Sequence, residues 1–340
     1  MDSQASATAL LVTADQVAEA ATRLTGRIRQ TPLLRLAAGD LCDVPVTLKL
    51  EQLQKAASFK ARGAFNSLLS QPRRPARVIA ASGGNHGIAV ALAAGELGIP
   101  AEIFIPAISA PAKVQRLRDL GAQVQQGGQD YAEALTAMQR RKAALAQTGE
   151  QVLEVHAYDQ ATVLAGQGTL AREFESQAPE VDTFFIAVGG GGLIGGCLAW
   201  LSGRKKVVAV EPRTSQAYNA ALTAGAPCDV TVAGVAADAL GARQVGQLSF
   251  NLAQAYPDGL LERILVEDEE IITARQAGAK RRPGHCRLRR QLRSGEFKLK
   301  IQTGRTDIRL FKNDACIAPA AWAYSSSLPR RAALSRRPDR

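Results

Sequence analysis

The strongest constraint on the fold is a regular alternation of strand-like and helix-like segments between residues 46 and 210. Such alternation predicts parallel sheets with helices packed on their faces. Glycine-containing breaks at residues 127–128 and 148–149 divide the segments into two groups, so we expect two open parallel sheets rather than one. The expected strands are residues 46–50, 77–81, 101–105, 123–126, 151–156, 183–188 and 207–210, and the expected helices are residues 59–69, 85–97, 111–120, 131–146 (capped by Asp130), 162–175 and 193–201.

We expect two domains and a tail. Residues 1–49 and 149–276 form the expected large domain, and residues 50–148 form the expected small domain. The 340-residue chain has a net charge of +11, but the excess lies in residues 277–340, which hold 17 Lys and Arg against 4 Asp and Glu. The rest of the chain holds 25 against 27 and is nearly neutral, which argues against a nucleic-acid partner. A non-catalytic binding protein whose functional part is the basic tail remains an alternative.

Composition excludes several other classes. No apolar run approaches the ~20 residues that cross a bilayer, and the first residues lack the basic start of a signal peptide, so we expect no membrane partner and a cytoplasmic protein. The five cysteines are scattered and form no C-x-x-C pair, which predicts neither a zinc site nor a disulfide framework.

The first motif of chemical interest is residues 58–64, which contain Lys60 at the expected start of a helix. Ser58 is the expected N-cap. The positive end of the helix dipole and the nearby Arg62 would both disfavour the charged form of Lys60. A neutral amine is what Schiff-base chemistry requires, although most lysines at helix ends are simply solvated.

The second motif is residues 81–87, where a strand ends in Ser82, Gly83 and Gly84 and a helix begins with Asn85 and His86. Free main-chain N–H groups at a helix start can hold an anion such as a substrate carboxylate. The Asn85 amide can also donate to a ligand oxygen. Taken alone, His86 fits a structural hydrogen bond better than a catalytic base.

The third motif is a run of four glycines, Gly189 to Gly192, between an expected strand and helix. Consecutive main-chain N–H groups at a helix start are suited to phosphate. The segment 190–195 also matches G-x-G-x-x-G, and Glu211 ends the next expected strand, as in dinucleotide-binding sites. A nicotinamide-dependent oxidoreductase is therefore the alternative enzyme, although it leaves the first two motifs without a role.

Together these motifs resemble the fold-type-II pyridoxal-phosphate (PLP) enzymes, in particular the serine/threonine dehydratases (threonine ammonia-lyases) and the related serine racemases. The resemblance runs from residue 31 to about residue 275, with the three motifs in order. It implies a two-domain fold like that of the tryptophan synthase β-subunit, PLP as cofactor, and a homodimer or homotetramer.

The resemblance also implies a role for each motif residue. Lys60 would bind PLP as a Schiff base and then remove the substrate α-proton. Phe59 would line the cofactor pocket. The remaining roles would be a hydrogen bond from Asn85 to the phenolic oxygen of PLP, a carboxylate-binding loop of Ser82, Gly83, Gly84, Asn85 and His86, and a phosphate cradle of Gly189, Gly190, Gly191, Gly192 and Leu193.

The implied reaction is elimination of water from L-threonine or L-serine, giving 2-oxobutanoate or pyruvate plus ammonia. Serine racemases carry a serine where Gly83 stands, and glycine cannot serve as an acid or base, so elimination is favoured over racemisation. A serine racemase or a 3-hydroxyaspartate dehydratase remains an alternative. The racemases' metal site would involve Glu211 and Ser215, but its acidic partner falls at Ala217, so no metal site is predicted.

The tail departs from the family. After about residue 276 we find neither the expected Glu-Pro-x-Gly-type motif nor the Ser- or Cys-Gly-Gly-Asn turn whose first residue, the Ser or Cys, contacts the pyridine nitrogen in the family. Hydrophobic periodicity is poor, which is typical of disorder. A reading-frame change or a comparable replacement is our hypothesis for residues 277–340, with a basic nucleic-acid-binding arm or an unusual variant end as alternatives.

Overall fold

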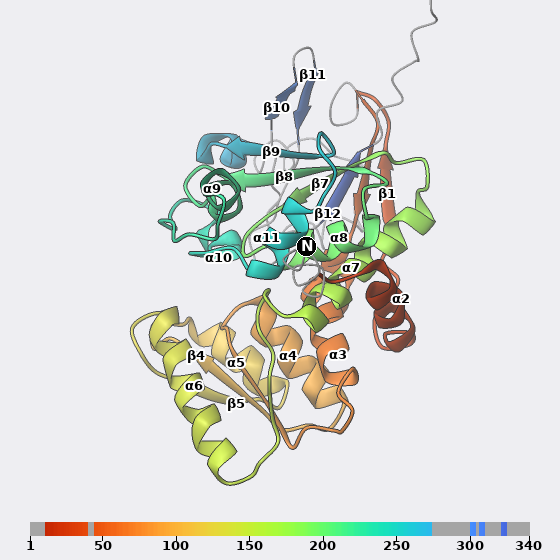
Figure 1. Ribbon diagram of the computed structural model, residues 1–340. Coiled ribbons are helices and arrows are strands. Elements are labelled where there is room, and N and C mark those ends of the chain that lie inside the picture. Colours follow the sequence, from red (N-terminus) through yellow and green to blue (C-terminus); the bar gives the residue numbers. More distant parts are fainter. Residues whose placement is uncertain (1–10, 40–43, 274–299, 304–305, 310–320, 325–340) are drawn as a thin grey trace, which may run out of the picture.

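A computed structural model describes residues 11–39 and 44–273 and, farther on, the backbones of three short strands at 300–303, 306–309 and 321–324. Figure 1 shows two lobes, each with its own sheet, as the sequence predicted. Among the described helices, none is both long and apolar enough to cross a membrane. Most of the basic tail, on which the frame-change and disorder hypotheses depend, lies outside the described residues.

The smaller lobe contains a four-stranded sheet in the order β5-β4-β3-β6, and every pair in it is parallel. Its central strands are fully buried along almost their whole length, as expected where helices cover both faces. Its elements are β3 (Arg77–Ala81), α4 (Asn85–Glu96), β4 (Ala101–Ile105), α5 (Pro111–Asp119), β5 (Gln123–Gln126), α6 (Tyr131–Gln147) and β6 (Val152–Glu154). The Asp130 side chain accepts from the Glu133 amide, so Asp130 is the predicted N-cap of α6.

The larger lobe contains a six-stranded sheet in the order β1-β2-β12-β7-β8-β9. The strands β7 (Thr183–Ala187), β8 (Lys206–Pro212) and β9 (Leu261–Val266) are parallel, and β1 (Leu33–Leu36) pairs antiparallel with β2 (Val46–Lys49). The sequence patterns indicated neither β1 nor β9.

The tail contributes to this sheet. Strand β12 (Ala321–Tyr324) lies between β2 and β7 and is antiparallel to both. The tail strands β10 (Lys300–Thr303) and β11 (Thr306–Arg309) form a separate antiparallel pair. Without β12, the facing edges of β2 and β7 would both have unpaired main-chain groups.

Three helices form a closely packed stack where the lobes meet: α3 (Lys60–Leu69), α7 (Ala161–Gln177) and α8 (Gly192–Leu201). Their backbones touch at glycines. A Cβ atom on Gly166 would lie 2.6 Å from the carbonyl oxygen of Arg62, and one on Gly168 would lie 2.5 Å from that of Gly196. Both separations are too short for a side chain, so glycine at these positions lets α7 pack directly on both neighbours.

The remaining elements cover the larger lobe or connect the lobes. Two main apolar clusters are present, one around α7, α8, β7 and β8 and the other around α3, α4, β3 and β4. Two sheets with two cores support our proposal that residues 50–148 and residues 1–49 with 149–276 are separate domains. The connecting and covering elements are α2 (Ala14–Arg23), η1 (Glu51–Leu53), η2 (Lys55–Ala57), α9 (Ala217–Ala224), α10 (Ala237–Leu240) and α11 (Gln247–Gln254).

Candidate active site

Lys60 is the first residue of α3, but its surroundings differ from the predicted ones. The N-cap is Phe59, the residue directly before Lys60, and the Ser58 hydroxyl makes no helix-capping bond. The buried Phe59 ring lies 5.3 Å from the Lys60 Nζ atom, and this Nζ donates to the carbonyl oxygen of Ala157 at 2.5 Å. The amine is thus fixed between an aromatic ring and a main-chain acceptor.

Burial lowers the pKa of Lys60 from 10.5 to about 8. The direction agrees with the sequence argument, but the cause differs. Arg62, which was expected to repel the lysine charge, is instead paired with the carboxylates of Glu51 and Glu173. A substantial fraction of neutral amine near pH 8 suits Lys60 to attack an aldehyde.

The glycine run forms the turn between β7 and α8. Gly191 is the N-cap of α8 with φ of +91°, a left-handed conformation that favours glycine. A Cβ atom on Gly190 would lie 2.3 Å from the Tyr158 ring, and the Ser249 hydroxyl donates to the Gly191 carbonyl at 2.7 Å. The turn therefore has no room for side chains and presents the main-chain N–H groups of Gly192 and Leu193 at a helix start.

The residues Ser82 to His86 form the turn between β3 and α4, with Gly84 as N-cap and Asn85 as the first helical residue. The Gly84 amide donates to the Ser82 hydroxyl at 3.2 Å. His86 is buried, and its Nε2 lies 2.8 Å from the carbonyl oxygen of Val155. Since burial and the nearby Lys60 charge lower the pKa of His86 to about 3, its ring stays neutral. The group that His86 offers to an anion is therefore its main-chain amide.

A segment that sequence analysis missed brings the three motifs together. Val155 accepts from His86, Ala157 accepts from Lys60, and Tyr158 packs on Gly190. His156 shapes this segment, because its Nδ1 accepts the amides of Tyr158 at 3.2 Å and Asp159 at 2.8 Å. A run of His, Tyr and Asp directly after a strand was the available signal.

Asp159, at the end of this segment, ties it to the larger lobe. Its carboxylate accepts the amides of Gln247 and Leu248, each at 3.0 Å, at the start of α11. A carboxylate at a helix start is stabilised by the helix dipole as well as by these hydrogen bonds. The segment 155–159 is therefore anchored to both lobes.

Glu211 has a structural role. Its buried carboxylate accepts the amides of Tyr218 at 2.9 Å and Asn219 at 2.7 Å, which caps the start of α9. Burial raises its pKa to about 7. These contacts occupy the carboxylate that the dinucleotide alternative needs for a ribose. Within the described ranges, no group of three His, Cys, Asp or Glu residues is placed to hold a metal ion.

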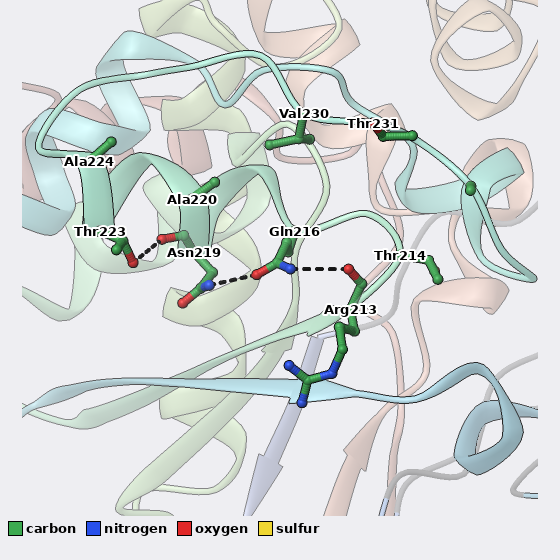
Figure 2. A pocket seen from close by; sticks show the side chains of 10 residues that line it. Arg213, Thr214, Gln216, Asn219, Ala220, Thr223, Ala224, Val230 and Thr231 are labelled. Atoms are coloured by element: carbon green, nitrogen blue, oxygen red, sulfur yellow. Dashed lines mark hydrogen bonds between the residues drawn. The ribbon is translucent and has the colours of Figure 1, made fainter.

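A separate cavity of about 730 Å³ lies beside α9 in the larger lobe (Figure 2). Its polar side chains partly satisfy one another: Asn219 donates to Gln216 at 2.7 Å, and Gln216 donates to the Arg213 carbonyl at 3.2 Å. No residue of the three motifs lines it. The candidate active site is therefore at the junction of the lobes.

The fold and this junction define a class: two α/β lobes with a partly buried lysine near a glycine-rich helix start. Residues 24–282 match the family model described as pyridoxal-phosphate dependent enzyme. The chain belongs to that family, and its cofactor is pyridoxal phosphate.

The relatives found by sequence include two L-threonine ammonia-lyases. The chain is 35% identical over 264 residues to that of Geobacter sulfurreducens, covering 76% of this chain and 64% of the relative. It is 35% identical over 270 residues to that of Thermotoga maritima, covering 78% and 65%. The chain thus spans just under two thirds of the length of these relatives.

Solved structures agree with the family assignment. The threonine deaminase of T.th. superposes with a TM-score of 0.70 at 30% identity, covering 79% of this chain and 87% of that one. Maize serine racemase also superposes with a TM-score of 0.70, at 28% identity, covering 79% of this chain and 81% of that one. Both names fall within the resemblance that the sequence motifs indicated.

The residues present fit the cofactor. Because Tyr158 and Ser249 pack against Gly190 and Gly191 and leave no room for side chains, the turn exposes main-chain N–H groups, which suit a phosphate. Lys60 supplies an amine with a lowered pKa for the aldehyde. The apolar face of Phe59 borders that amine.

Proposed function

We propose that the chain is a PLP-dependent ammonia-lyase that converts L-threonine to 2-oxobutanoate and ammonia, or L-serine to pyruvate and ammonia, by α,β-elimination. The observation that carries the proposal is the position of Lys60, whose amine has a lowered pKa and bonds to the segment 155–159, which also contacts both glycine-containing turns. The relatives' names, L-threonine ammonia-lyase and threonine deaminase, support this substrate class.

Each side chain has a proposed task. Lys60 would hold the cofactor through its amine, and its neutral Nζ would take the α-proton of the substrate. Phe59 lines the cofactor pocket, and Asn85 donates to the phenolic oxygen. The main-chain amides of the two turns bind the anionic groups. The substrate carboxylate is held by Ser82, Gly83, Gly84, Asn85 and His86. The cofactor phosphate is held by Gly189, Gly190, Gly191, Gly192 and Leu193. When bound, PLP supplies the electron sink for the negative charge at the substrate α-carbon.

Elimination is proposed over racemisation because Gly83 has no side chain that could act on the opposite face of the substrate. A direct comparison tests this. Purified protein with added PLP is incubated with L-threonine, L-serine or 3-hydroxyaspartate, and 2-oxo acid, ammonia and D-serine are measured. We expect 2-oxo acid and ammonia in equal amounts from threonine or serine. D-Serine as the main product would instead favour a racemase, and turnover of 3-hydroxyaspartate alone would favour the corresponding dehydratase.

The cofactor and its lysine are tested by visible absorption. We expect a yellow band with PLP that borohydride abolishes and that Lys60→Ala removes. Lys55→Ala is the matched control, since Lys55 is a nearby lysine paired with Glu96 on the surface, and it should keep the band. A colourless wild-type protein that instead quenches NADH fluorescence would favour the oxidoreductase alternative.

We also propose a cytoplasmic location and a homodimer or homotetramer, in line with the sequence expectations. Light scattering on the purified protein measures the mass directly. A monomer would contradict this part of the proposal.

A further inference from the structure

The first turn of α3, which carries Lys60, has no conventional cap. Phe59 occupies the N-cap position and offers no side-chain acceptor. The Ser58 hydroxyl is buried and has no hydrogen-bond partner among the described residues. A helix start without a cap is normally prone to fraying, which would leave the Lys60 amine poorly fixed.

Arg62, two residues farther along, supplies the missing attachment. Its guanidinium is completely buried and forms a two-pronged contact with Glu51, from Nε to Oε2 at 2.8 Å and from Nη2 to Oε1 at 2.7 Å. Its Nη1 donates to Glu173 at 2.9 Å and to the Thr169 hydroxyl at 3.2 Å. Paired donation of this kind fixes the plane and the distance of the guanidinium.

A second cation completes the cluster. Lys49, which is also fully buried, donates to Glu173, to the Thr31 carbonyl at 2.8 Å and to the Gln177 side chain at 2.6 Å. The Thr31 hydroxyl in turn donates to Glu51 at 2.6 Å. We call Lys49, Glu51, Arg62 and Glu173 the buried charge cluster; two cations and two anions make it neutral overall.

Within the buried charge cluster, Arg62 and Glu173 keep their charges. Burial would lower the pKa of Arg62, but the carboxylates of Glu51 and Glu173 outweigh it and raise that pKa. Burial would likewise raise the pKa of Glu173, but Arg62 and Lys49 outweigh it and lower that pKa. Breaking one pair would leave the other charges buried without compensation, which is costly.

The buried charge cluster lies on the side of α3 opposite to the Lys60 amine. At 100° per residue, Lys60 and Arg62 point to opposite sides of α3. The Lys60 amine reaches Ala157 on one side, and the Arg62 guanidinium reaches α7 and η1 on the other. Fixing Arg62 therefore fixes the rotation and height of the first turn on which Lys60 stands.

We propose that Arg62, held by Glu51 and Glu173, is a positioning residue that sets the location of the Lys60 amine relative to the glycine turn. The proposal rests on the proposed function, in that Lys60 is the cofactor lysine. The buried charge cluster would then position the Lys60 amine in addition to stabilising the fold.

The test is Arg62→Lys in the full chain with PLP, since lysine keeps the charge but cannot form the two-pronged contact. Arg77→Lys is the matched control: Arg77 forms a comparable partly buried cluster with Glu102 and Glu150 in the smaller lobe. Urea unfolding, the pH titration of the visible band of Lys60-bound cofactor, and kcat and KM are measured for both variants.

We expect both variants to lose stability, but only Arg62→Lys to shift the midpoint of the band's pH titration. Its kcat should fall about tenfold or more while KM changes less than about threefold, because a displaced amine slows proton transfer more than binding. If Arg62→Lys does not fold, Glu173→Gln weakens the same contact and is scored identically.

An unshifted titration and a kcat like that of Arg77→Lys would overturn the positioning role and leave the cluster purely structural. Failure of the proposed function is separate, because it would show in the wild type as the absence of a borohydride-sensitive band.

Discussion

Replacing Lys60 by methionine in the cofactor-free protein should stabilise the fold in a pH-dependent way. Burial lowers the pKa of Lys60 from 10.5 to about 8. At about 1.36 kcal/mol per pH unit, this difference corresponds to at most about 3 kcal/mol, and to less in practice because part of the side chain faces solvent. Methionine has a similar length and no charge, so it removes this cost.

The direction in which the stability of the wild type changes with pH follows from the number of protons that each state binds. Between pH 8 and 10.5 the unfolded chain keeps the Lys60 proton while the folded chain has lost it, so the stability of the wild type rises with pH in that range. Below pH 8 both states hold the proton and the full cost of the buried charge is present. The advantage of Lys60→Met over the wild type should therefore be largest at about pH 7 and shrink by about 2–3 kcal/mol by about pH 10.5.

Urea unfolding followed by far-UV circular dichroism measures this difference at each pH. Lys60→Met also loses the hydrogen bond to Ala157. The wild type keeps this bond at both pH 7 and pH 10.5, so its contribution cancels when the change in stability between the two pH values is compared. Lys142→Met, which removes a half-exposed lysine paired with Glu154, is the matched control. A constant gap between Lys60→Met and the wild type across this pH range would refute the argument that burial lowers this pKa.

Three further predictions concern the backbone. In Gly190→Ala the new Cβ would lie 2.3 Å from the Tyr158 ring, so we expect PLP binding to weaken about tenfold or more in a titration of the visible band. In Gly83→Ser the Cβ would lie at an ordinary 3.4 Å from Ile105, so the free energy of unfolding should change by less than about 0.5 kcal/mol. The new hydroxyl should allow some racemisation, which chiral chromatography would detect as D-serine. Absence of D-serine would contradict the inference that glycine at this position prevents racemisation. In Ala323→Pro a main-chain N–H is lost from β12, which pairs on both sides, so we expect a loss of about 2 kcal/mol or more; an unchanged Tm would show that this tail strand contributes nothing to the sheet.

Much of the architecture was predictable because its signals are local. The buried strands of the smaller lobe are short apolar runs, and their helices begin at recognisable residues such as Asp130 and Pro111. The boundaries of these elements agree with the sequence expectations to within a few residues. Strand β12 could not be predicted, since its pairing depends on two partners far away in the chain.

The candidate site was only partly predictable. Its three glycine- and lysine-containing turns were visible because each joins a strand or loop to a helix start. The expected N-cap at Ser58 was wrong, because the fold holds this helix start through Arg62 instead. Such a cluster leaves a weak trace in the sequence: Lys49 ends β2 and Glu51 begins η1. Charged residues at the end of a buried strand imply buried partners but do not identify them.

The glycine contacts between α3, α7 and α8 have a mechanical consequence. Helices whose backbones touch cannot slide or rotate without collision, so these three behave as a single stiff block. Lys60 stands at one end of this block and the glycine turn leads into another part of it. If Lys60 and the glycine turn hold the cofactor as proposed, this packing fixes the distance between its two attachment points. The turn at residues 82–86 leads into α4, which packs on α3 but is not one of the three helices whose glycines bring their backbones into contact.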